Sequence, residues 1–368
     1  MIRLTRQTLE KYQVLIYFVA VGGGLVIGMA QPMWLGTLEA MLRPALALLL
    51  YATFTQVPLA HLRESIADRR FILAAVVGNF LIVPALVAGL AQCLPGDVAI
   101  RLGVLMVLLA PCTDWFITFT HLGGGDAQRA IAFAPVSLLL QGLLLPLYLW
   151  LFLGEALGAA MVWREMLIAF GSLILLPLLG AWLTERWAES APRRRSILGK
   201  LAWFPLPLLA VVVFIIAATQ VNLVAGSLAA LGRLLFIFVA YLILAGLIAC
   251  GLARAFRLPT AQGRVLAFSL GTRNSFVVLP LALALPPAFG LAVVAIVFQS
   301  LVELVGMVTY LWWVPRRLFP EAARSAAQEG ATRRGALTID AAGPLGQGEH
   351  SPLLTRPAQR THHLEPSE

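Results

Sequence analysis

The chain has 368 residues, of which 60% are apolar and 12% charged, whereas soluble globular proteins average about 45–50% and about 25%. The apolar residues form runs long enough to cross a bilayer, separated by short polar clusters. These features exclude a soluble enzyme, a nucleic-acid-binding protein and a disulfide-stapled secreted module, and they indicate a polytopic membrane protein. The net charge of +9 has an ordinary cause in such a protein, because cytoplasmic loops collect Lys and Arg.

A membrane-spanning helix needs about 20 mostly apolar residues. In chain order, the sequence predicts ten spans, at 14–30, 42–60, 71–91, 100–119, 130–153, 163–183, 201–219, 232–253, 265–285 and 289–314. The first run, with its basic start and the small residues Gly28 and Ala30, also fits a secretory signal peptide. We favour a span, because the run is long for a signal peptide and its loss would break the repeat described below. Residues 321–368 are rich in small and polar residues and predict a disordered tail.

The distribution of positive charge predicts the orientation. With the N-terminus inside, 22 of the 27 Lys and Arg residues fall in inner segments or in the tail, and four fall in outer loops. The remaining one, Arg273, lies within the ninth span. Because inner loops are the positive ones, we expect both termini in the cytoplasm. The short loops and the lack of a targeting segment favour a bacterial inner membrane.

Two short sequence matches indicate an internal repeat. Gln56-Val57 recurs 164 residues later as Gln220-Val221, and Tyr148-Leu149-Trp150 recurs 162 residues later as Tyr310-Leu311-Trp312. Each half then holds five spans, an odd number, so the second copy is inverted in the membrane, which is typical of secondary transporters. We therefore expect an all-α polytopic fold of ten transmembrane helices in two inverted five-helix repeats, residues 1–153 and 154–320.

Polar residues interrupt the fourth and ninth spans at equivalent places. The fourth contains Ala110-Pro111-Cys112-Thr113-Asp114 and the ninth Gly271-Thr272-Arg273-Asn274-Ser275, so that at offset 162 Cys112 and Thr113 fall opposite Asn274 and Ser275. Irregular backbone at membrane depth is tolerated only where it is packed in protein or lines a cavity. Two symmetric breaks predict one shared solute site. The alternative is a pair of kinked helices held by hydrogen bonds, with no ligand.

The span interiors contain three ionisable residues, Asp114, Arg273 and Glu303. A charge at the bilayer centre costs at least about 2.5–3.5 kcal/mol, so we expect all three to face the protein interior. We expect Asp114 and Arg273, one at each break, to form an ion pair. The pair either takes part in transport or is a purely structural salt bridge. Asn79 and Gln299 are further polar candidates, or else ordinary interhelical hydrogen-bonding residues.

These motifs resemble those of the arsenite efflux permeases, which belong to the bile acid:sodium symporter superfamily. The resemblance covers roughly residues 12–318 and rests on Leu109-Ala110-Pro111-Cys112-Thr113, His121-Leu122, Gly125-Asp126, Gln141, Asn79-Phe80 with Pro84, Asn274-Ser275-Phe276 and Leu301-Val302-Glu303. It implies ten helices in two inverted repeats, with spans four and nine crossing at their breaks. It also implies a panel domain and a core domain with the site between them.

The resemblance implies that Cys112 meets trivalent arsenic as a thiolate. Two features depart from the family pattern. Val277 stands where the arsenite branch has a ninth-helix glutamate implicated in proton coupling, and Asp114 and Arg273 replace uncharged residues. A buried Arg273 near two half-helix N-termini suits an anion, whereas arsenous acid is neutral at neutral pH.

Three hypotheses follow. The first is a secondary active transporter that exports arsenite or a related trivalent metalloid by proton antiport. The second is a sodium-coupled symporter of an organic anion, in which Thr113, Asn274, Ser275, Gln299 and Glu303 offer oxygen ligands to sodium. The third is a receptor or scaffold of the same fold that no longer transports.

For a transporter, the predicted substrate-binding residues are Cys112, Thr113, Asn274, Ser275, Arg273 and Asn79, and the predicted ion-coupling residues are Asp114, Glu303 and Gln299. The expected partners are a small inorganic or organic solute, a proton or sodium ion and the lipid bilayer. We expect no cofactor, no resident metal ion, no nucleic acid and no enzymatic activity, and the chain has no phosphate-binding loop of the Walker type.

Overall fold

The computed structural model describes residues 6–57, 68–94, 96–113, 115–153, 168, 170–189, 192–221 and 228–320. Contacts divide the chain into Met1–Glu321 and Ala322–Glu368, and every described residue lies in the first unit. The predicted tail at 321–368 and the candidate Asp114 lie outside the described residues. Within the described ranges all regular elements are helical, which confirms the predicted all-α class for this part of the chain.

The described α-helices, in chain order, are α1 (Arg6–Ala30), α2 (Leu35–Phe54), α4 (Arg69–Val77), α5 (Val83–Ala91), α6 (Val98–Leu109), α7 (Trp115–Leu122), α8 (Ala127–Leu153), α10 (Leu176–Glu189), α11 (Pro192–Leu201), α12 (Pro205–Thr219), α14 (Leu228–Ala255), α15 (Thr260–Gly271), α16 (Ser275–Leu283) and α17 (Gly290–Trp313). Three wider π-helical turns extend them: η3 (Gly78–Ile82) joins α4 to α5, η4 (Phe170–Leu175) precedes α10, and η6 (Val314–Leu318) follows α17. Two short 3-10 turns, η1 (Pro32–Trp34) and η5 (Pro287–Phe289), precede α2 and α17.

Six described helical stretches are long and apolar enough to cross a membrane. They match the second, third, fifth, seventh, eighth and tenth predicted spans and run over Pro32–Phe54, Arg69–Ala91, Ala127–Phe152, Ser196–Thr219, Ala230–Ala255 and Pro287–Leu318. The first and fourth predicted spans contain shorter apolar helices, Leu15–Ala30 and Val98–Leu109. The chain is therefore a multi-pass membrane protein, while the count of ten spans stays a prediction.

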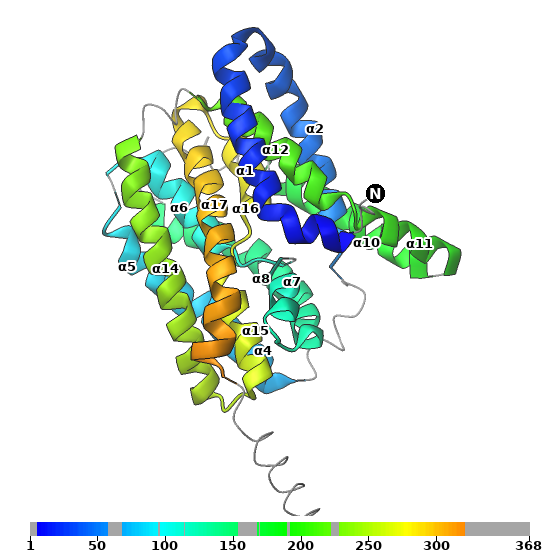
Figure 1. Cartoon of the computed structure of the whole chain (residues 1–368), viewed down its shortest axis with the longest axis vertical. Helices are drawn as coiled ribbons and strands as arrows, with labels where there is room; N and C mark the ends of the chain where they lie inside the picture. The colour runs from blue at the N-terminus through cyan, green and yellow to red at the C-terminus, as the bar shows by residue number, and fades with distance from the viewer. Residues whose placement is uncertain are drawn as a thin grey trace, which may run out of the picture. The chain divides into compact units, whose positions relative to one another are not determined.

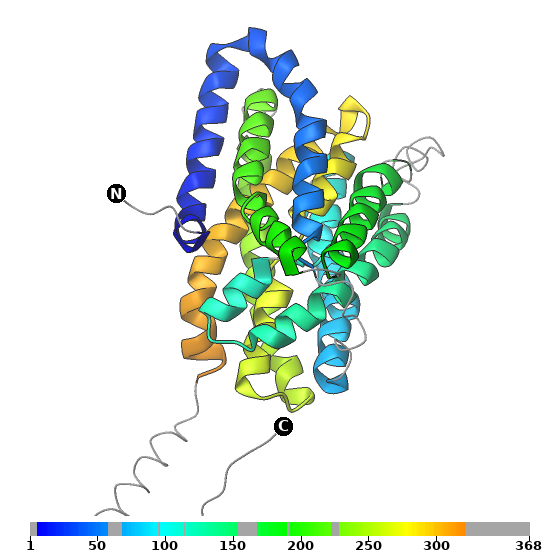
Figure 2. The same cartoon turned by 90° about the vertical axis from the view of Figure 1, so that its right-hand side faces the viewer.

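The helices of this unit pack in two groups (Figures 1 and 2). In the first group α12 lies between α1 and α2, and α10 lies against α2. In the second group α6 packs on α17, α14 packs on both α15 and α17, and α7 and α8 adjoin each other. Contacts of α16 with α2 and with η4 join the two groups.

Both predicted helix breaks are present. Helix α6 ends at Leu109 and α7 begins at Trp115, while α15 ends at Gly271 and α16 begins at Ser275. Adding 162 to the bounds of α6, residues 98 and 109, gives 260 and 271, which are the bounds of α15. The predicted repeat requires this correspondence.

Two tyrosine hydrogen bonds follow the same offset. The hydroxyl of Tyr148 donates to the carbonyl of Phe80, and the hydroxyl of Tyr310 donates to the carbonyl of Leu242. Donor and acceptor are 68 residues apart in each bond, so adding 162 to the first bond gives the second. Positions related by the predicted repeat offset thus make corresponding contacts at this pair of bonds.

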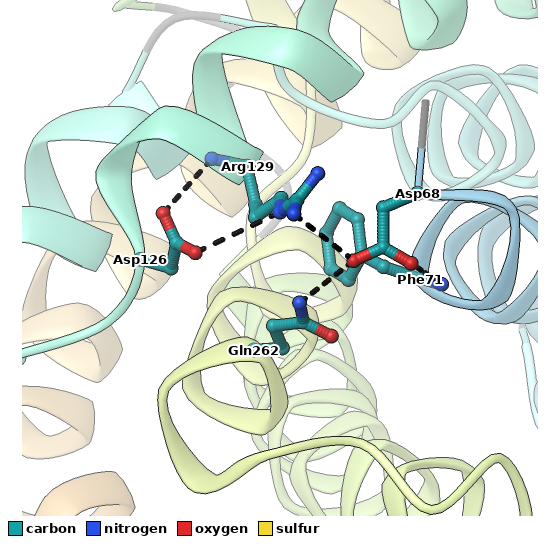
Figure 3. Close-up of polar contacts among 5 residues, drawn as sticks. All are labelled: Asp68, Phe71, Asp126, Arg129 and Gln262. Carbon is teal, nitrogen blue, oxygen red and sulfur yellow. Dashed lines mark hydrogen bonds and ion pairs between the residues drawn. The ribbon is translucent and has the colours of Figure 1, made fainter. Parts of the chain in front are cut away.

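A cluster of polar side chains joins the N-terminal ends of α4, α8 and α15 (Figure 3). Asp68 accepts from the backbone N–H of Phe71 at 3.2 Å and from the Gln262 side chain at 2.8 Å, which caps α4 and ties it to α15. Arg129 lies 3.4 Å from the Asp68 carboxylate and 3.8 Å from that of Asp126. These ion pairs are partly exposed and contribute little free energy, so the cluster mainly fixes how the three helix ends are arranged.

Candidate functional site

The two helix breaks meet and pair through their backbones. Pro111 and Arg273 form an isolated antiparallel bridge. The N–H of Cys112 donates to the carbonyl of Thr272 at 3.3 Å, and the N–H of Asn274 donates to the carbonyl of Ala110 at 2.7 Å. Backbone groups freed by a helix break need partners at membrane depth, and here each break supplies partners for the other.

The paired breaks are themselves symmetric. Adding 162 to Ala110 and Cys112 gives Thr272 and Asn274, so the repeat offset exchanges the two backbone hydrogen bonds with one another. Pro111 and Arg273, which face each other in the bridge, are likewise 162 residues apart. If a two-fold axis related the two predicted repeats, it would pass through this crossing point. We call residues 110–113 and 272–275 the crossing.

Short polar side chains fill the crossing. Asn274 donates from Nδ2 to the Thr113 hydroxyl at 3.3 Å, and its Oδ1 accepts from the N–H of Val277 at 3.3 Å, which caps α16. Cys112, Thr113 and Asn274 are all buried. The structure thus places Cys112, Thr113 and Asn274 in one segment pair, where the half-helices begin and end, with a direct side-chain contact between Thr113 and Asn274.

A chain of hydrogen bonds leads from the crossing to Glu303 on α17. The Ser275 hydroxyl donates to Gln299 Oε1 at 2.9 Å, and Gln299 Nε2 donates to Glu303 Oε2 at 2.6 Å. The same carboxylate oxygen accepts from the backbone N–H of Arg273 at 2.9 Å. Gln299 and Glu303 are four residues apart and so share one face of α17. A change in the charge of Glu303 would therefore change the strength of its hydrogen bond to the bridged backbone.

The Arg273 side chain is buried, and its two Nη atoms donate to four oxygens of the protein, while its Nε has no partner among the described residues. Its Nη2 donates to Asn79 Oδ1 at 2.9 Å and to the carbonyls of Ser269 and Leu270 at 2.8 Å each, and its Nη1 donates to the carbonyl of Leu108 at 3.3 Å. The face of the Tyr241 ring lies 5.6 Å from the guanidinium carbon, within the range of a cation–π contact.

The nine predicted site residues divide as follows. Asp114 lies outside the described residues, so its expected ion pair with Arg273 stays a prediction. The other eight lie in the crossing or within one hydrogen bond of a residue in it: Cys112, Thr113, Arg273, Asn274, Ser275, Asn79, Gln299 and Glu303. The structure therefore gathers the sequence candidates in one place, although it places the Arg273 guanidinium on oxygens of the protein itself.

Sequence reasoning missed two residues that contact this site. The Ser269 hydroxyl accepts from Asn79 Nδ2 at 3.0 Å, and Tyr241 donates from its hydroxyl to the Leu270 carbonyl at 2.7 Å. The repeat offset could have identified Tyr241, since adding 162 to the number of Asn79 gives 241. Ser269 carried no signal, because a serine inside an apolar helix is common.

Gln141 is a further buried polar residue, on α8. Both polar atoms of its side chain have no hydrogen-bond partner among the described residues. With Val277 it lines a cavity of about 250 Å³ between α8, α16 and the η4–α10 segment. The cavity lies where the first group of helices meets the second, and its other lining residues are mostly apolar.

Comparison with known proteins gives the family. The profile described as the Sodium Bile acid symporter family matches residues 43–227, just over half of the chain. No curated protein matches the chain at a significant level.

Proposed function

The chain belongs to the sodium bile acid symporter family, and we propose that it is an ion-coupled secondary transporter built from two inverted five-helix repeats, residues 1–153 and 154–320. Secondary transporters of this kind bind their solute near the membrane midplane, where broken helices from the two repeats meet. The observation that carries the proposal is the crossing, in which the repeat offset exchanges the two backbone hydrogen bonds. Movement of the α1, α2, α10 and α12 group against the other helices would open the site to each side in turn.

For the solute, we propose arsenite or a related trivalent metalloid, moved outward. Cys112 lies in the bridged segment, and a thiolate is the soft ligand that a trivalent metalloid prefers. Its neighbours Thr113, Asn274 and Ser275 are uncharged hydrogen-bonding groups, which suit a neutral hydroxylated solute. The guanidinium of Arg273 donates to oxygens of the protein, so a charged substrate gains less from it than the sequence alone indicated.

For the coupling ion, we propose the proton, with Glu303 as the residue that carries it. Glu303 is buried and accepts hydrogen bonds from Gln299 and from the backbone of Arg273. Ionisable residues within membrane spans commonly form proton relays. Protonation of Glu303 would weaken its hydrogen bond to the backbone N–H of Arg273. The charge state of Glu303 would in this way affect the position of the half-helices.

The second candidate is a sodium-coupled symporter of an organic anion. The family description is consistent with it, since it names sodium and bile acid. Oxygen atoms of Ser275, Gln299 and Glu303 lie in one hydrogen-bonded chain near the crossing, and those of Thr113 and Asn274 form a separate pair. A sodium ion would have to break these bonds to use all five residues.

We also propose the bacterial inner membrane as the location, with both termini in the cytoplasm. The charge distribution supports this orientation, since 22 of the 27 Lys and Arg residues would then lie in inner segments.

Flux into everted membrane vesicles tests the function. Vesicles containing the chain receive arsenite or labelled taurocholate under an imposed proton gradient, an imposed sodium gradient or neither. We expect uptake of arsenite, stimulated by the proton gradient, and its loss in Cys112→Ser but not in the matched variants Cys93→Ser and Cys250→Ser. Sodium-stimulated taurocholate flux without arsenite flux would replace this proposal with the second candidate, and no gradient-dependent flux of either solute would contradict both.

A further inference from the structure

The contacts of the Arg273 guanidinium resemble the coordination of a metal cation. Nη2 carries two hydrogens, yet three oxygens lie within 2.9 Å of it: Asn79 Oδ1 and the carbonyls of Ser269 and Leu270. At least one N–H is therefore shared between two oxygens, as in the bifurcated bonds that helix-end carbonyls three and four residues apart from a donor often accept. A fourth oxygen, the carbonyl of Leu108, lies 3.3 Å from Nη1.

Three of these four oxygens come from the C-terminal ends of two half-helices, and the fourth is the side-chain oxygen of Asn79 in η3. Leu108 is the next-to-last residue of α6, and Ser269 and Leu270 lie in the last turn of α15. The C-terminal end of a helix carries partial negative charge and favours cations. Leu108 and Leu270 are 162 residues apart, so equivalent carbonyls of the two halves converge on the guanidinium.

In secondary transporters with broken helices, carbonyls of half-helix C-terminal ends coordinate the coupling cation. Here the cation in that position is covalently attached to the chain. Arg273 is 2% exposed as a residue, and Asn79 is held in place through its own hydrogen bonds to Ala75 and Ser269. The guanidinium nitrogens therefore occupy the position among the four oxygens that a coordinated cation would take.

We propose that the guanidinium of Arg273 is a tethered cation, which permanently fills a monovalent-cation site formed by Asn79, Leu108, Ser269 and Leu270. The chain then needs no sodium at this point, and loss of the side chain opens a site for sodium. One consequence of this inference rests on the proposed function: if the chain is an ion-coupled transporter, another group such as Glu303 must carry the coupling ion. The filled site itself is a structural property and is tested without any transport.

Thermal unfolding of the purified full-length protein in detergent tests the proposal. The midpoint Tm is measured by intrinsic tryptophan fluorescence in NaCl and in choline chloride at equal ionic strength, for the parent and for Arg273→Ala. We expect equal midpoints for the parent in the two salts. For Arg273→Ala we expect a lower midpoint in choline chloride and a saturable recovery of roughly 3–5 °C in NaCl, because a ligand that binds only the folded state stabilises it.

Arg264→Ala is the matched control. Arg264 is also buried and also donates to carbonyls, those of Phe319 and Gly124. Its oxygens come from two separate loops rather than from paired helix ends, so NaCl and choline chloride should act alike on this variant. Sodium-specific recovery of Arg264→Ala equal to that of Arg273→Ala would overturn the proposal.

A second probe, methylguanidinium, serves if Arg273→Ala folds poorly. Added during expression and purification at low millimolar concentration, it should restore the yield and Tm of Arg273→Ala but leave Arg264→Ala unchanged. The parent and the single variant Glu303→Gln are also titrated with NaCl. If sodium raises the Tm of both proteins saturably, an open sodium site exists at the crossing that does not depend on Glu303, and this would contradict the tethered cation. A folded Arg273→Ala protein that responds neither to sodium nor to methylguanidinium would contradict it as well.

Discussion

In the mechanism that we propose, Glu303 connects the charge of one side chain to the position of the crossing. Its Oε2 accepts from both Gln299 Nε2 at 2.6 Å and the backbone N–H of Arg273 at 2.9 Å. Hydrogen bonds to a charged acceptor are about twice as strong as neutral ones. The bond to the bridged backbone therefore strengthens or weakens as the carboxylate loses or gains a proton, which is the link that proton coupling requires.

Glu303→Gln separates this charge from the hydrogen bonds. An amide oxygen can accept from both Gln299 and Arg273, so the substitution removes the charge while these two donors keep an acceptor. We expect normal amounts of protein in the membrane and exchange of arsenite across vesicles at zero gradient. We also expect that a proton gradient no longer stimulates flux, so that the rates with and without the gradient become equal.

Glu185→Gln on α10 is the matched control, because Glu185 is also a buried glutamate. It lies on a helix of the first group rather than at the crossing, so its flux should still respond to the proton gradient. Gradient-stimulated arsenite flux at the parental level in Glu303→Gln would remove Glu303 from the coupling mechanism.

At this scale the sequence could predict which residues meet but not how each is used. The meeting of Cys112, Thr113, Asn274 and Ser275 could be predicted, since helix-breaking polar residues at equal offsets imply a shared place in an inverted repeat. The hydrogen-bond acceptors of Arg273 that the structure describes could not be predicted, because counting charges points only to carboxylates, and the expected pair with Asp114 stays a prediction. In the structure carbonyl oxygens of helix ends surround the guanidinium, and backbone acceptors leave no mark in a sequence.

At the scale of elements, the contact of α1 with α12 shows how close packing is obtained in a bilayer. Gly24 and Gly28, one turn apart on α1, are buried against α12. A side-chain carbon on Gly24 would strike the carbonyl oxygen of Phe214, and one on Gly28 that of Ala218. Small residues four positions apart allow such close approach of membrane helices.

Gly28→Ala should therefore push α1 away from α12. The added methyl group meets backbone atoms of Ala218, which cannot rotate away, and overpacking of this kind typically costs about 1–3 kcal/mol. Gly22→Ala on the same helix is the control, since a side-chain carbon there meets nothing within 4 Å and alanine favours the helix by roughly 0.5–1 kcal/mol. Thermal unfolding should give a lower Tm for Gly28→Ala and an equal or higher Tm for Gly22→Ala. Equal effects of the two substitutions would contradict the close contact.

Helix positions followed well from the sequence, whereas their internal geometry did not. Runs of apolar residues placed the spans, and the polar interruptions placed the ends of α6 and α15. The π-helical turn η3 around Asn79 was not among the predicted features, although Pro84, which has no N–H, stands near the start of α5 directly after the turn. That turn lies on the helix that brings Asn79 to the guanidinium of Arg273.

At the scale of the whole molecule, the inverted repeat predicts the topology. Reporter fusions after residues 40, 97, 158, 226 and 287 should report the outer side, and fusions after 66, 125, 192 and 260 the inner side. The physical reason is the charge asymmetry of the loops together with an odd number of spans in each half. Alkaline phosphatase and green fluorescent protein fusions measure the two sides independently. Reversal at two adjacent positions would contradict the repeat.

The central claim is that the crossing of the two broken helices is the solute site, and modification of Cys112 tests it most directly. In a protein carrying Cys93→Ser and Cys250→Ser, the rate of maleimide labelling of Cys112 is measured with increasing arsenite, and with arsenate as the control ligand. We expect arsenite to slow labelling, with half protection at the concentration that gives half-maximal vesicle flux, and arsenate to have no effect. A labelling rate that stays constant at arsenite concentrations that saturate transport would contradict the account.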